Sequence, residues 1–264
     1  MQKECDILII DDEMVVLDAV SKICAAHGYG VSTAMDGASA LRKLDQVAYR
    51  LIICDIMMPE VDGFHILEVV RGGHPLTAVI MTTGYSTIEH AVRSLGSGAM
   101  GYLPKPFTEK ELVSAIKRGL RYAELEVKSR FGEDPENTSA RNEIGGEGSS
   151  YRLGWISWVR IEKAGSAVVG VTENFLKTIA PVKHIALMSV SDEVVQGTSC
   201  AQITCTDDCT HDVLGPISGS IVEVNGQVST DASTTERYPR GNGWLYRLIP
   251  SEVAYELRQL IAWP

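Results

Sequence analysis

The chain has 264 residues, of which 45% are hydrophobic and 22% are charged, values that exclude a wholly disordered protein. At roughly 100–200 residues per domain, this length predicts two domains. The longest apolar runs, such as Ile7–Ile10, are far too short to cross a bilayer, so we expect no membrane association.

The chain is acidic: it has 34 acidic and 24 basic residues, and its net charge is −10. Residues 1–125 carry 12 basic and 16 acidic side chains, residues 126–150 carry 3 and 6, and residues 151–264 carry 9 and 12. No part offers the basic face that nucleic acids require, and no helix-turn-helix pattern is present. A transcription factor is therefore disfavoured, and we expect no nucleic-acid partner.

The amino terminus and the cysteines predict a cytoplasmic protein. The first residues include Glu4 and Asp6, and further acids follow at Asp11 and Asp12, so we expect neither a signal nor a transit peptide. The six cysteines, at positions 5, 24, 54, 200, 205 and 209, are too thinly spread for a disulfide framework. Such usage is typical of a reducing compartment.

Strand and helix patterns alternate through the first 125 residues. The apolar runs predict strands over 6–10, 31–34, 51–54, 78–82 and 102–103. Helical periodicity and two capping boxes predict helices over 14–27, 38–44, 63–71, 86–95 and 108–125. Five such units predict an α/β doubly wound parallel sheet, whose ligands bind beyond the carboxyl ends of the strands.

The amino-acid composition and the predicted secondary structure change twice after this first domain, residues 1–125. Residues 126–150 are poor in apolar side chains and rich in Gly, Ser and Glu, which predicts a flexible linker. A third region, 151–264, is mostly β. Its predicted strands are 155–161, 167–171, 200–206, 220–224 and 244–248, and a helix is predicted over 251–261.

Polar residues follow four strands of the predicted parallel sheet. Asp11 and Asp12 come after the first strand, Asp55 ends the third, Thr83 follows the fourth and Lys105 follows the fifth. Clustered carboxylates repel one another unless a cation joins them, and a hard oxygen cage suits Mg²⁺. Lys105 would supply a positive charge for an anion bound in the same place.

These residues and their surroundings resemble a response regulator receiver domain over about residues 4–125. The matching stretches are Ile7–Glu13, Asp55–Gly63, Met81–Tyr85 and Leu103–Phe107. The resemblance implies a flavodoxin-like sheet with its five parallel strands in the order 2-1-3-4-5. It also implies a role in two-component signalling, with a sensor histidine kinase or phosphotransfer protein as partner.

The resemblance assigns a role to each residue of the acidic pocket. Asp55 would be the phosphoacceptor. Mg²⁺ would be bound directly by Asp12, through water by Asp11, and by Asp55 and the backbone carbonyl of Met57.

Three further residues would bind or sense the phosphoryl group. Lys105 would pair with one of its oxygens, Thr83 would hydrogen-bond another, and Tyr102 would swing inward as the aromatic switch. The peptide bond from Lys105 to Pro106 would be cis. Taken singly, these residues have simpler interpretations: Asp12 as a helix N-cap, Tyr102 as a half-buried edge residue and Lys105 as a solvated lysine.

Four stretches of the last region resemble the glycine cleavage system H protein, a lipoyl carrier. They are Ser157–Ile161, Val169–Phe175, Pro216–Asn225 and Arg240–Leu245. The resemblance covers about residues 151–262 and implies a mostly β barrel-sandwich hybrid.

The chain departs from the H protein at the residue that carries lipoate. That position falls at Asp207 or Asp208, depending on the register, and no lysine occurs after Lys183. A carboxylate cannot form the lipoyl amide, so we expect no lipoate.

The same hairpin carries Cys200, Cys205, Cys209 and His211. Thiolates and imidazole suit zinc, and a thiol pair suits redox chemistry. The alternative is that these are small packing residues around a turn, which the uncommon spacing favours.

Together, the two resemblances indicate a cytoplasmic response regulator with a non-lipoylated, protein-docking output domain. Its output partner is not identified by the sequence, and a phosphorylation-dependent homodimer is one form that the switch would take. We expect no enzyme, beyond the receiver's help in its own phosphoryl transfer. The alternative is a regulated subunit of an enzyme complex that uses the cysteine hairpin for redox or metal chemistry.

Overall fold

The computed structural model describes residues 6–131 and 149–263. The chain divides into two compact units, residues 1–87 with 97–133 and residues 88–96 with 134–264. Helix α4 (Ile88–Gly96), which the sequence analysis counted with the first domain, falls in the second unit. Within the described residues, no helix is both long and apolar enough to cross a membrane.

The first unit contains a parallel five-stranded sheet in the order β2-β1-β3-β4-β5, which confirms the predicted topology. Its strands are β1 (Ile7–Ile10), β2 (Val31–Ala34), β3 (Leu51–Asp55), β4 (Ala78–Thr83) and β5 (Gly101–Pro104). The three central strands, β1, β3 and β4, are buried along their whole length, as expected for a sheet covered on both faces.

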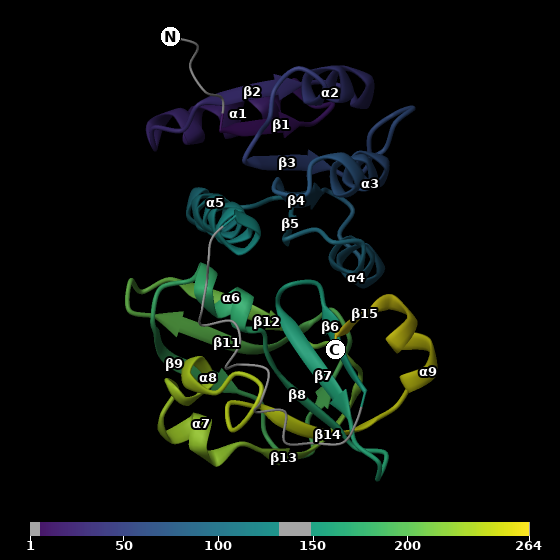
Figure 1. Cartoon of the computed structure of the whole chain (residues 1–264), viewed down its shortest axis with the longest axis vertical. Coiled ribbons are helices and arrows are strands. Elements are labelled where there is room, and N and C mark those ends of the chain that lie inside the picture. The colour runs from purple at the N-terminus through teal and green to yellow at the C-terminus, as the bar shows by residue number, and fades with distance from the viewer. Residues whose placement is uncertain (1–5, 132–148, 264) are drawn as a thin grey trace. The chain divides into compact units, whose positions relative to one another are not determined.

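Four helices pack on this sheet. They are α1 (Met14–Ala26), α2 (Gly37–Leu44), α3 (Gly63–Gly73) and α5 (Glu109–Phe131). Helix α1 contacts α5 and α2 contacts α3, and the two pairs lie on opposite sides of the sheet (Figure 1). The predicted capping box at α5 is present, since Thr108 N–H donates to Glu111 and Glu111 N–H donates to Thr108. Helix α5 continues past its predicted end to Phe131, so the linker predicted from residue 126 begins within a helix; its residues 132–148 lie outside the described part.

The second unit is mostly antiparallel β, as predicted. A seven-stranded sheet has the order β10-β13-β14-β8-β7-β6-β15, and a three-stranded sheet has the order β12-β11-β9. The strands are β6 (Ser150–Leu153), β7 (Ser157–Ile161), β8 (Ala167–Val171), β9 (Val182–Leu187), β10 (Glu193–Val194), β11 (Ser199–Cys205), β12 (Thr210–Leu214), β13 (Gly219–Val224), β14 (Tyr246–Pro250) and β15 (Ile261–Trp263). Inward-facing residues of both sheets, such as Val159, Val169, Ile203 and Leu248, form one core.

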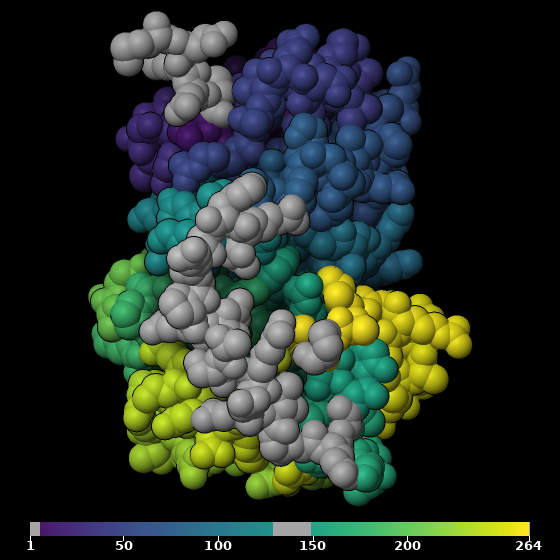
Figure 2. Space-filling view, viewed as in Figure 1, coloured from purple at the N-terminus to yellow at the C-terminus, as the bar shows by residue number. Residues whose placement is uncertain are grey.

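Short helical segments connect these strands. They are α6 (Glu173–Thr178), α7 (Gly226–Thr230), α8 (Thr234–Arg237), α9 (Val253–Glu256) and the 3₁₀ turn η3 (Leu257–Gln259). The helix predicted over 251–261 was therefore wrong in its last part. The chain instead returns to the sheet, where Ile261 pairs with Arg152 of β6. The carboxy-terminal residues, yellow in Figure 2, lie at the surface of this unit.

Candidate functional site

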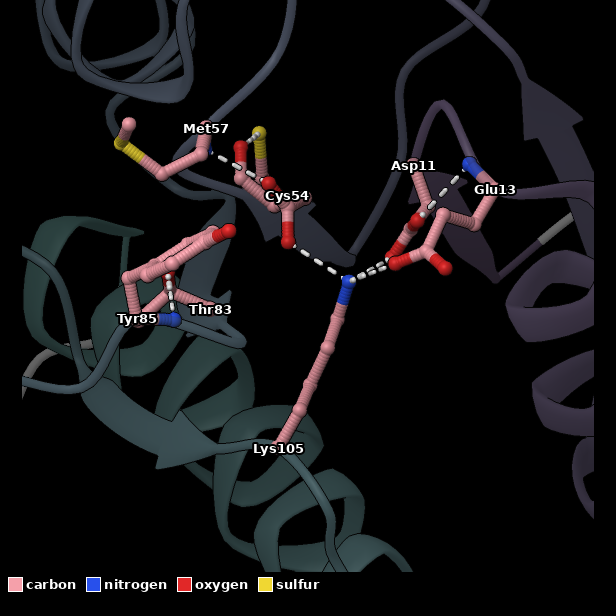
Figure 3. Close-up of polar contacts among 8 residues, drawn as sticks. Asp11, Glu13, Cys54, Met57, Thr83, Tyr85 and Lys105 are labelled. Carbon is pink, nitrogen blue, oxygen red and sulfur yellow. Dashed lines mark hydrogen bonds and ion pairs between the residues drawn. The ribbon is translucent and has the colours of Figure 1, made fainter.

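Four strands of the first sheet deliver polar side chains to one edge, as the sequence predicted. Asp11 directly follows β1, Asp55 is the last residue of β3, Thr83 is the last residue of β4, and Lys105 directly follows β5. The strands are parallel, so their carboxyl ends meet at this edge. Figure 3 shows the Lys105 side chain extending from its loop towards the carboxylates.

Lys105 joins the two buried carboxylates. Its Nζ lies 2.6 Å from Asp55 Oδ1, 2.7 Å from Asp11 Oδ2 and 3.8 Å from Glu13 Oε1. Only 13% of the lysine side chain is exposed, so the interpretation of Lys105 as a solvated lysine is wrong. Burial lowers the pKa of Lys105, but the hydrogen bonds and charges of Asp11 and Asp55 outweigh it and raise that pKa overall. The ammonium therefore stays charged and fixed at this edge.

The backbone holds the Asp55 carboxylate from the other side. Its Oδ2 accepts a hydrogen bond of 2.6 Å from the N–H of Met57. The following loop folds back closely, because a Cβ on Gly63 would lie 2.2 Å from the carbonyl oxygen of Asp55. A glycine at this position is therefore required by the packing of the loop against the strand end.

Asp11 and Asp12 occupy different environments although they are neighbours. Asp11 is buried, and burial is the main reason that its pKa is raised above the usual value, against the opposing effect of Lys105. Asp12 is exposed. The N-cap position of α1 belongs to Glu13, so Asp12 is not the cap of this helix.

The donor set at this edge suits Mg²⁺. No three carboxylate, thiol or imidazole side chains gather closely enough to enclose a metal within residues 6–131 and 149–263. Mg²⁺ usually retains several waters and takes only one or two protein carboxylates, which Asp55 and one of the neighbours Asp11 and Asp12 would supply. Asp11 is a buried carboxylate whose ionised form is disfavoured, and a cation would stabilise that form.

The two expected switch residues are at the rim of this edge. Thr83 is fully buried, and its Oγ1 accepts a hydrogen bond of 3.1 Å from the N–H of Tyr85. Tyr102 is half-buried, and its hydroxyl donates to Ser86 Oγ at 3.1 Å. Both are therefore tied to the loop after β4. The peptide bond between Lys105 and Pro106 is cis, as expected.

The second candidate site is the hairpin of β11 and β12. Cys205 N–H donates to the carbonyl oxygen of Cys209 at 2.9 Å, and Asp208 N–H donates to that of Cys205 at 3.0 Å. Asp208 has a φ of 58°, in the left-handed region that Asp tolerates at turns. Asp207 and Asp208 therefore form the tip of the hairpin, where the sequence analysis expected the lipoyl position.

Two of the hairpin cysteines, Cys200 and Cys205, are packing residues in this structure, and the third, Cys209, is half-buried. Cys200 and Cys205 are buried, and burial raises the pKa of Cys200 to about 12 and that of Cys205 to about 11. His211 is also buried, and its ring makes an edge contact with Phe175. No metal-binding group of these side chains is found in the part of the chain that the structure describes. The geometry favours the packing interpretation over a metal or redox site.

The sequence analysis gave no role to two residues that the structure places at these sites. Glu13 adds a carboxylate near the Lys105 ammonium, and its position directly after the Asp pair was the available signal. Lys183 extends from β9 to the hairpin tip, where its Nζ lies 2.9 Å from Asp208 Oδ1. Sequence separation concealed this contact, because it depends on the pairing of β9 with β11.

Comparison with known proteins agrees with both halves of this description. The response regulator receiver domain model matches residues 7–117, and the glycine cleavage H-protein model matches residues 150–262. Receiver domains in general bind Mg²⁺ and receive a phosphoryl group from a histidine kinase or phosphotransfer partner, and both domain types are typically carriers or regulators and not catalysts.

Two curated relatives each match about half of the chain. The chain is 30% identical over 148 residues to the transcriptional regulatory protein ZraR of Klebsiella oxytoca, covering 56% of this chain and 32% of that protein. It is 36% identical over 115 residues to the transcriptional regulatory protein TrcR of Mycobacterium tuberculosis, covering 44% of this chain and 45% of that protein. The chain thus spans less than half the length of either relative.

One solved structure in this group is a CheY-like response regulator receiver domain protein from Methanospirillum hungatei. It is 35% identical, with 46% of this chain and 96% of that chain covered and a TM-score of 0.44. The chain joins a member of the response regulator receiver family, over residues 7–117, to a member of the glycine cleavage H-protein family, over residues 150–262.

Proposed function

We propose that this protein is a response regulator that is phosphorylated on Asp55 and whose H-protein-like domain docks a partner protein without carrying lipoate. The observation that supports the first part best is the pair of contacts from Lys105 to Asp55 and Asp11. A fixed ammonium beside two buried carboxylates provides a place for the negative charge of a phosphoryl group.

The transfer follows from this arrangement. A carboxylate oxygen of Asp55 attacks the phosphorus of a phosphohistidine on the donor protein; a P–O bond forms as the P–N bond breaks, and the histidine leaves with the electron pair. Lys105 stabilises the charge on the transferred oxygens, and the Met57 N–H orients the nucleophile. Asp11, Asp12, Asp55 and the Met57 carbonyl would hold Mg²⁺, which when bound neutralises phosphoryl charge.

Thr83 and Tyr102 connect this event to the rest of the receiver. The Thr83 hydroxyl lies at the end of β4, beside the strand that ends in Asp55, and the register pairs Asp55 with Thr82. The Tyr85 N–H donates a hydrogen bond to Thr83 Oγ1, so movement of Thr83 towards a bound phosphoryl group would pull on the backbone at Tyr85. Tyr102, bonded to Ser86 in the same loop, would then move as the second part of a two-state switch.

We propose that the second domain functions by binding a partner protein at its surface. Its hairpin tip presents Asp207 and Asp208 and cannot form a lipoyl amide. The alternative, an enzyme-complex subunit that uses the hairpin cysteines, is disfavoured because Cys200 and Cys205 are buried and their raised pKa values leave little thiolate at neutral pH. We therefore propose domains at 1–125 and 151–264, connected through 126–150, with no enzymatic role for the second.

An affinity capture experiment with and without beryllofluoride, which mimics the acyl phosphate, tests this function. The same partner should bind more strongly, or a homodimer should form, when Asp55 carries the mimic. The difference should vanish in the Asp55→Asn variant, which serves as the matched control. Equal capture by both proteins in all conditions would refute the phosphorylation-gated docking function.

A further inference from the structure

The larger sheet of the second unit gathers arginine and tryptophan side chains on its outer face. β6 pairs with both β7 and β15, which places Arg160, Ser150 and Trp263 in one row across three strands. Residues paired across a sheet project from the same face, so Arg160 and Trp263 share a side. Trp158 shares it too, since it lies two residues before Arg160. This is the outer face, because the intervening Val159 belongs to the core.

Arg240 reaches the same face from the loop that follows α8. The carbonyl oxygen of the preceding residue, Pro239, accepts a hydrogen bond of 3.0 Å from Nε1 of Trp158. The guanidinium carbon of Arg240 lies 3.6 Å from the centre of the Trp263 ring, and that of Arg160 lies 5.7 Å from a ring of Trp158. We call these four residues, Trp158, Arg160, Arg240 and Trp263, the arginine–tryptophan face. Strands β6, β7 and β15, which carry three of them, lie next to one another in Figure 1.

Neither guanidinium of this face has a hydrogen-bond or ion-pair partner within residues 6–131 and 149–263. The Nε atoms of Arg160 and Arg240 are both buried and unpaired. A buried donor without an acceptor is costly, and these Nε atoms are shielded from an outside ligand as well as unpaired. The terminal nitrogens of the two guanidinium groups are not buried, and the stacking of Arg240 on Trp263 fixes the plane in which they can donate to an acceptor oxygen.

The carboxylates that interact electrostatically with these two arginines already form ion pairs with other residues. Glu162, which acts on Arg160 electrostatically, is held by Arg247 at 3.1 Å. Glu173, which acts on Arg240, is held by Lys177 at 2.6 Å. The two arginines therefore keep positive charge for a ligand from outside, although residues 151–264 carry a net charge of −3.

We propose that the arginine–tryptophan face docks an acidic segment of a partner protein, one that presents Asp or Glu carboxylates. The inference rests on the proposed docking function of this domain and names the chemistry of what is docked. A carboxylate can accept two parallel hydrogen bonds from one guanidinium, and the half-buried indole ring of Trp263 provides apolar contact beside it, whereas Trp158 is buried beneath this face. The domain is acidic as a whole, so an acidic segment needs a local group of unpaired positive charges, and the two arginines of this face provide one.

The test uses the full-length protein and a fluorescein-labelled peptide of alternating Glu and Ser, with a Gln/Ser peptide as control. Fluorescence anisotropy should show binding of the Glu peptide that weakens as salt rises, and binding of the Gln peptide that is weaker by roughly ten-fold or more. The R160Q/R240Q double variant should lose affinity for the Glu peptide by a similar factor. The K163Q/R237Q variant removes the same charge elsewhere in this domain and should bind as the wild type does.

Circular dichroism and labelling of Asp55 by acetyl phosphate check that the variants fold. If R160Q/R240Q is not folded, Arg240→Met retains the packing on Trp263 and should give the same loss. The inference is overturned if the wild type shows no Glu-dependent binding, or if Arg240→Met binds as tightly as wild type. It is also overturned if a single-stranded DNA oligonucleotide binds more tightly than the peptide, or if sedimentation shows that the arginine pair mediates self-association.

The experiments distinguish failure of the acidic-segment inference from failure of the proposed response-regulator function. If Asp55 is labelled normally and a partner is still captured with beryllofluoride in excess Glu peptide, docking stands and the arginine–tryptophan face is not its site. If Asp55 is never labelled, the receiver function fails whatever the peptide does.

Discussion

The ammonium of Lys183 lies 2.9 Å from Oδ1 of Asp208, at the tip of a hairpin that lies 25 residues further along the chain. Both side chains are largely exposed, so the ion pair contributes at most about 1 kcal/mol to stability. The last lysine of the chain is thus close to the tip, but it extends from β9 and is paired with the aspartate that we propose stands at the lipoyl position.

The first prediction is that the wild-type chain is not lipoylated. Intact mass should equal that of the unmodified chain after production with an active lipoyl ligase and excess lipoate, because Asp208 offers no amine and Lys183 is not part of the turn. Asp208→Lys places an amine at the tip and should permit modification where the hairpin shape is retained. A lipoyl increment on the wild type, mapped by peptide mass to Lys183, would contradict the non-carrier assignment.

A second prediction compares two glycines of α3. Gly63→Ala should lower the free energy of unfolding by several kcal/mol and impair phosphorylation, because the new Cβ would lie 2.2 Å from the Asp55 carbonyl oxygen. Gly73→Ala, at the other end of the helix, meets nothing within 4 Å and should be neutral or stabilising by up to about 1 kcal/mol. Urea denaturation measures both, and equal effects would show that the Gly63 contact is not what constrains this loop.

The third prediction concerns pH. The folded state raises the pKa of Asp11, mainly through burial, so folding favours its protonated form. The resulting stability is present below the unfolded pKa and is lost as pH rises through the folded pKa. Asp11→Asn should therefore raise the unfolding free energy at pH 7 and flatten the pH dependence in the acid range. Asp12→Asn, at the exposed neighbour, is the control. A lower melting temperature for Asp11→Asn at pH 7 would show that its bond to Lys105 outweighs burial.

A fourth prediction concerns the lifetime of the phosphorylated state. Met57 is two residues beyond Asp55, and 53% of it is exposed. Its thioether cannot orient a hydrolytic water by a strong hydrogen bond, so the phosphorylated wild type should be long-lived. Met57→Asn should release phosphate faster, by roughly ten-fold, and Met57→Ala should change the rate little. The decay of the labelled protein after removal of acetyl phosphate gives both rates, and an unchanged rate for Met57→Asn would refute this role.

The receiver fold could be predicted from the sequence because the residues that specify each strand and helix are close together in the chain. Apolar strands bounded by Asp11, Asp55 and Thr83 specify a parallel sheet, and the strand order and the convergence at one edge both agree with the structure. The sequence did not show that Asp11 is buried while Asp12 is exposed, because burial depends on the three-dimensional packing around the strand end and not on position in the motif.

The second domain was harder to predict, because its contacts join distant segments. No strand was predicted at β6, β9, β10, β12 or β15. β10 and β15 have only two and three residues, and the few apolar residues of β6, β9 and β12 are interrupted by polar ones. Ile261 pairs with Arg152 across more than 100 residues, which overrode the helical pattern of 251–261. Likewise the grouping of Arg240 with Trp263 follows from the return of the chain to β6.

The central claim is that Asp55 accepts the phosphoryl group with the help of Lys105 and Mg²⁺. Purified wild-type protein, Asp55→Asn, Lys105→Ala and Asp12→Ala would be incubated with acetyl phosphate and Mg²⁺, and intact mass would report the phosphorylated fraction. We expect the mass of one phosphoryl group to be added to the wild type, and this addition to be lost on mild base treatment and absent without Mg²⁺. Asp55→Asn should gain no phosphoryl group. Lys105→Ala should give a smaller phosphorylated fraction, and Asp12→Ala should need a higher Mg²⁺ concentration. Undiminished labelling of Asp55→Asn would contradict the account.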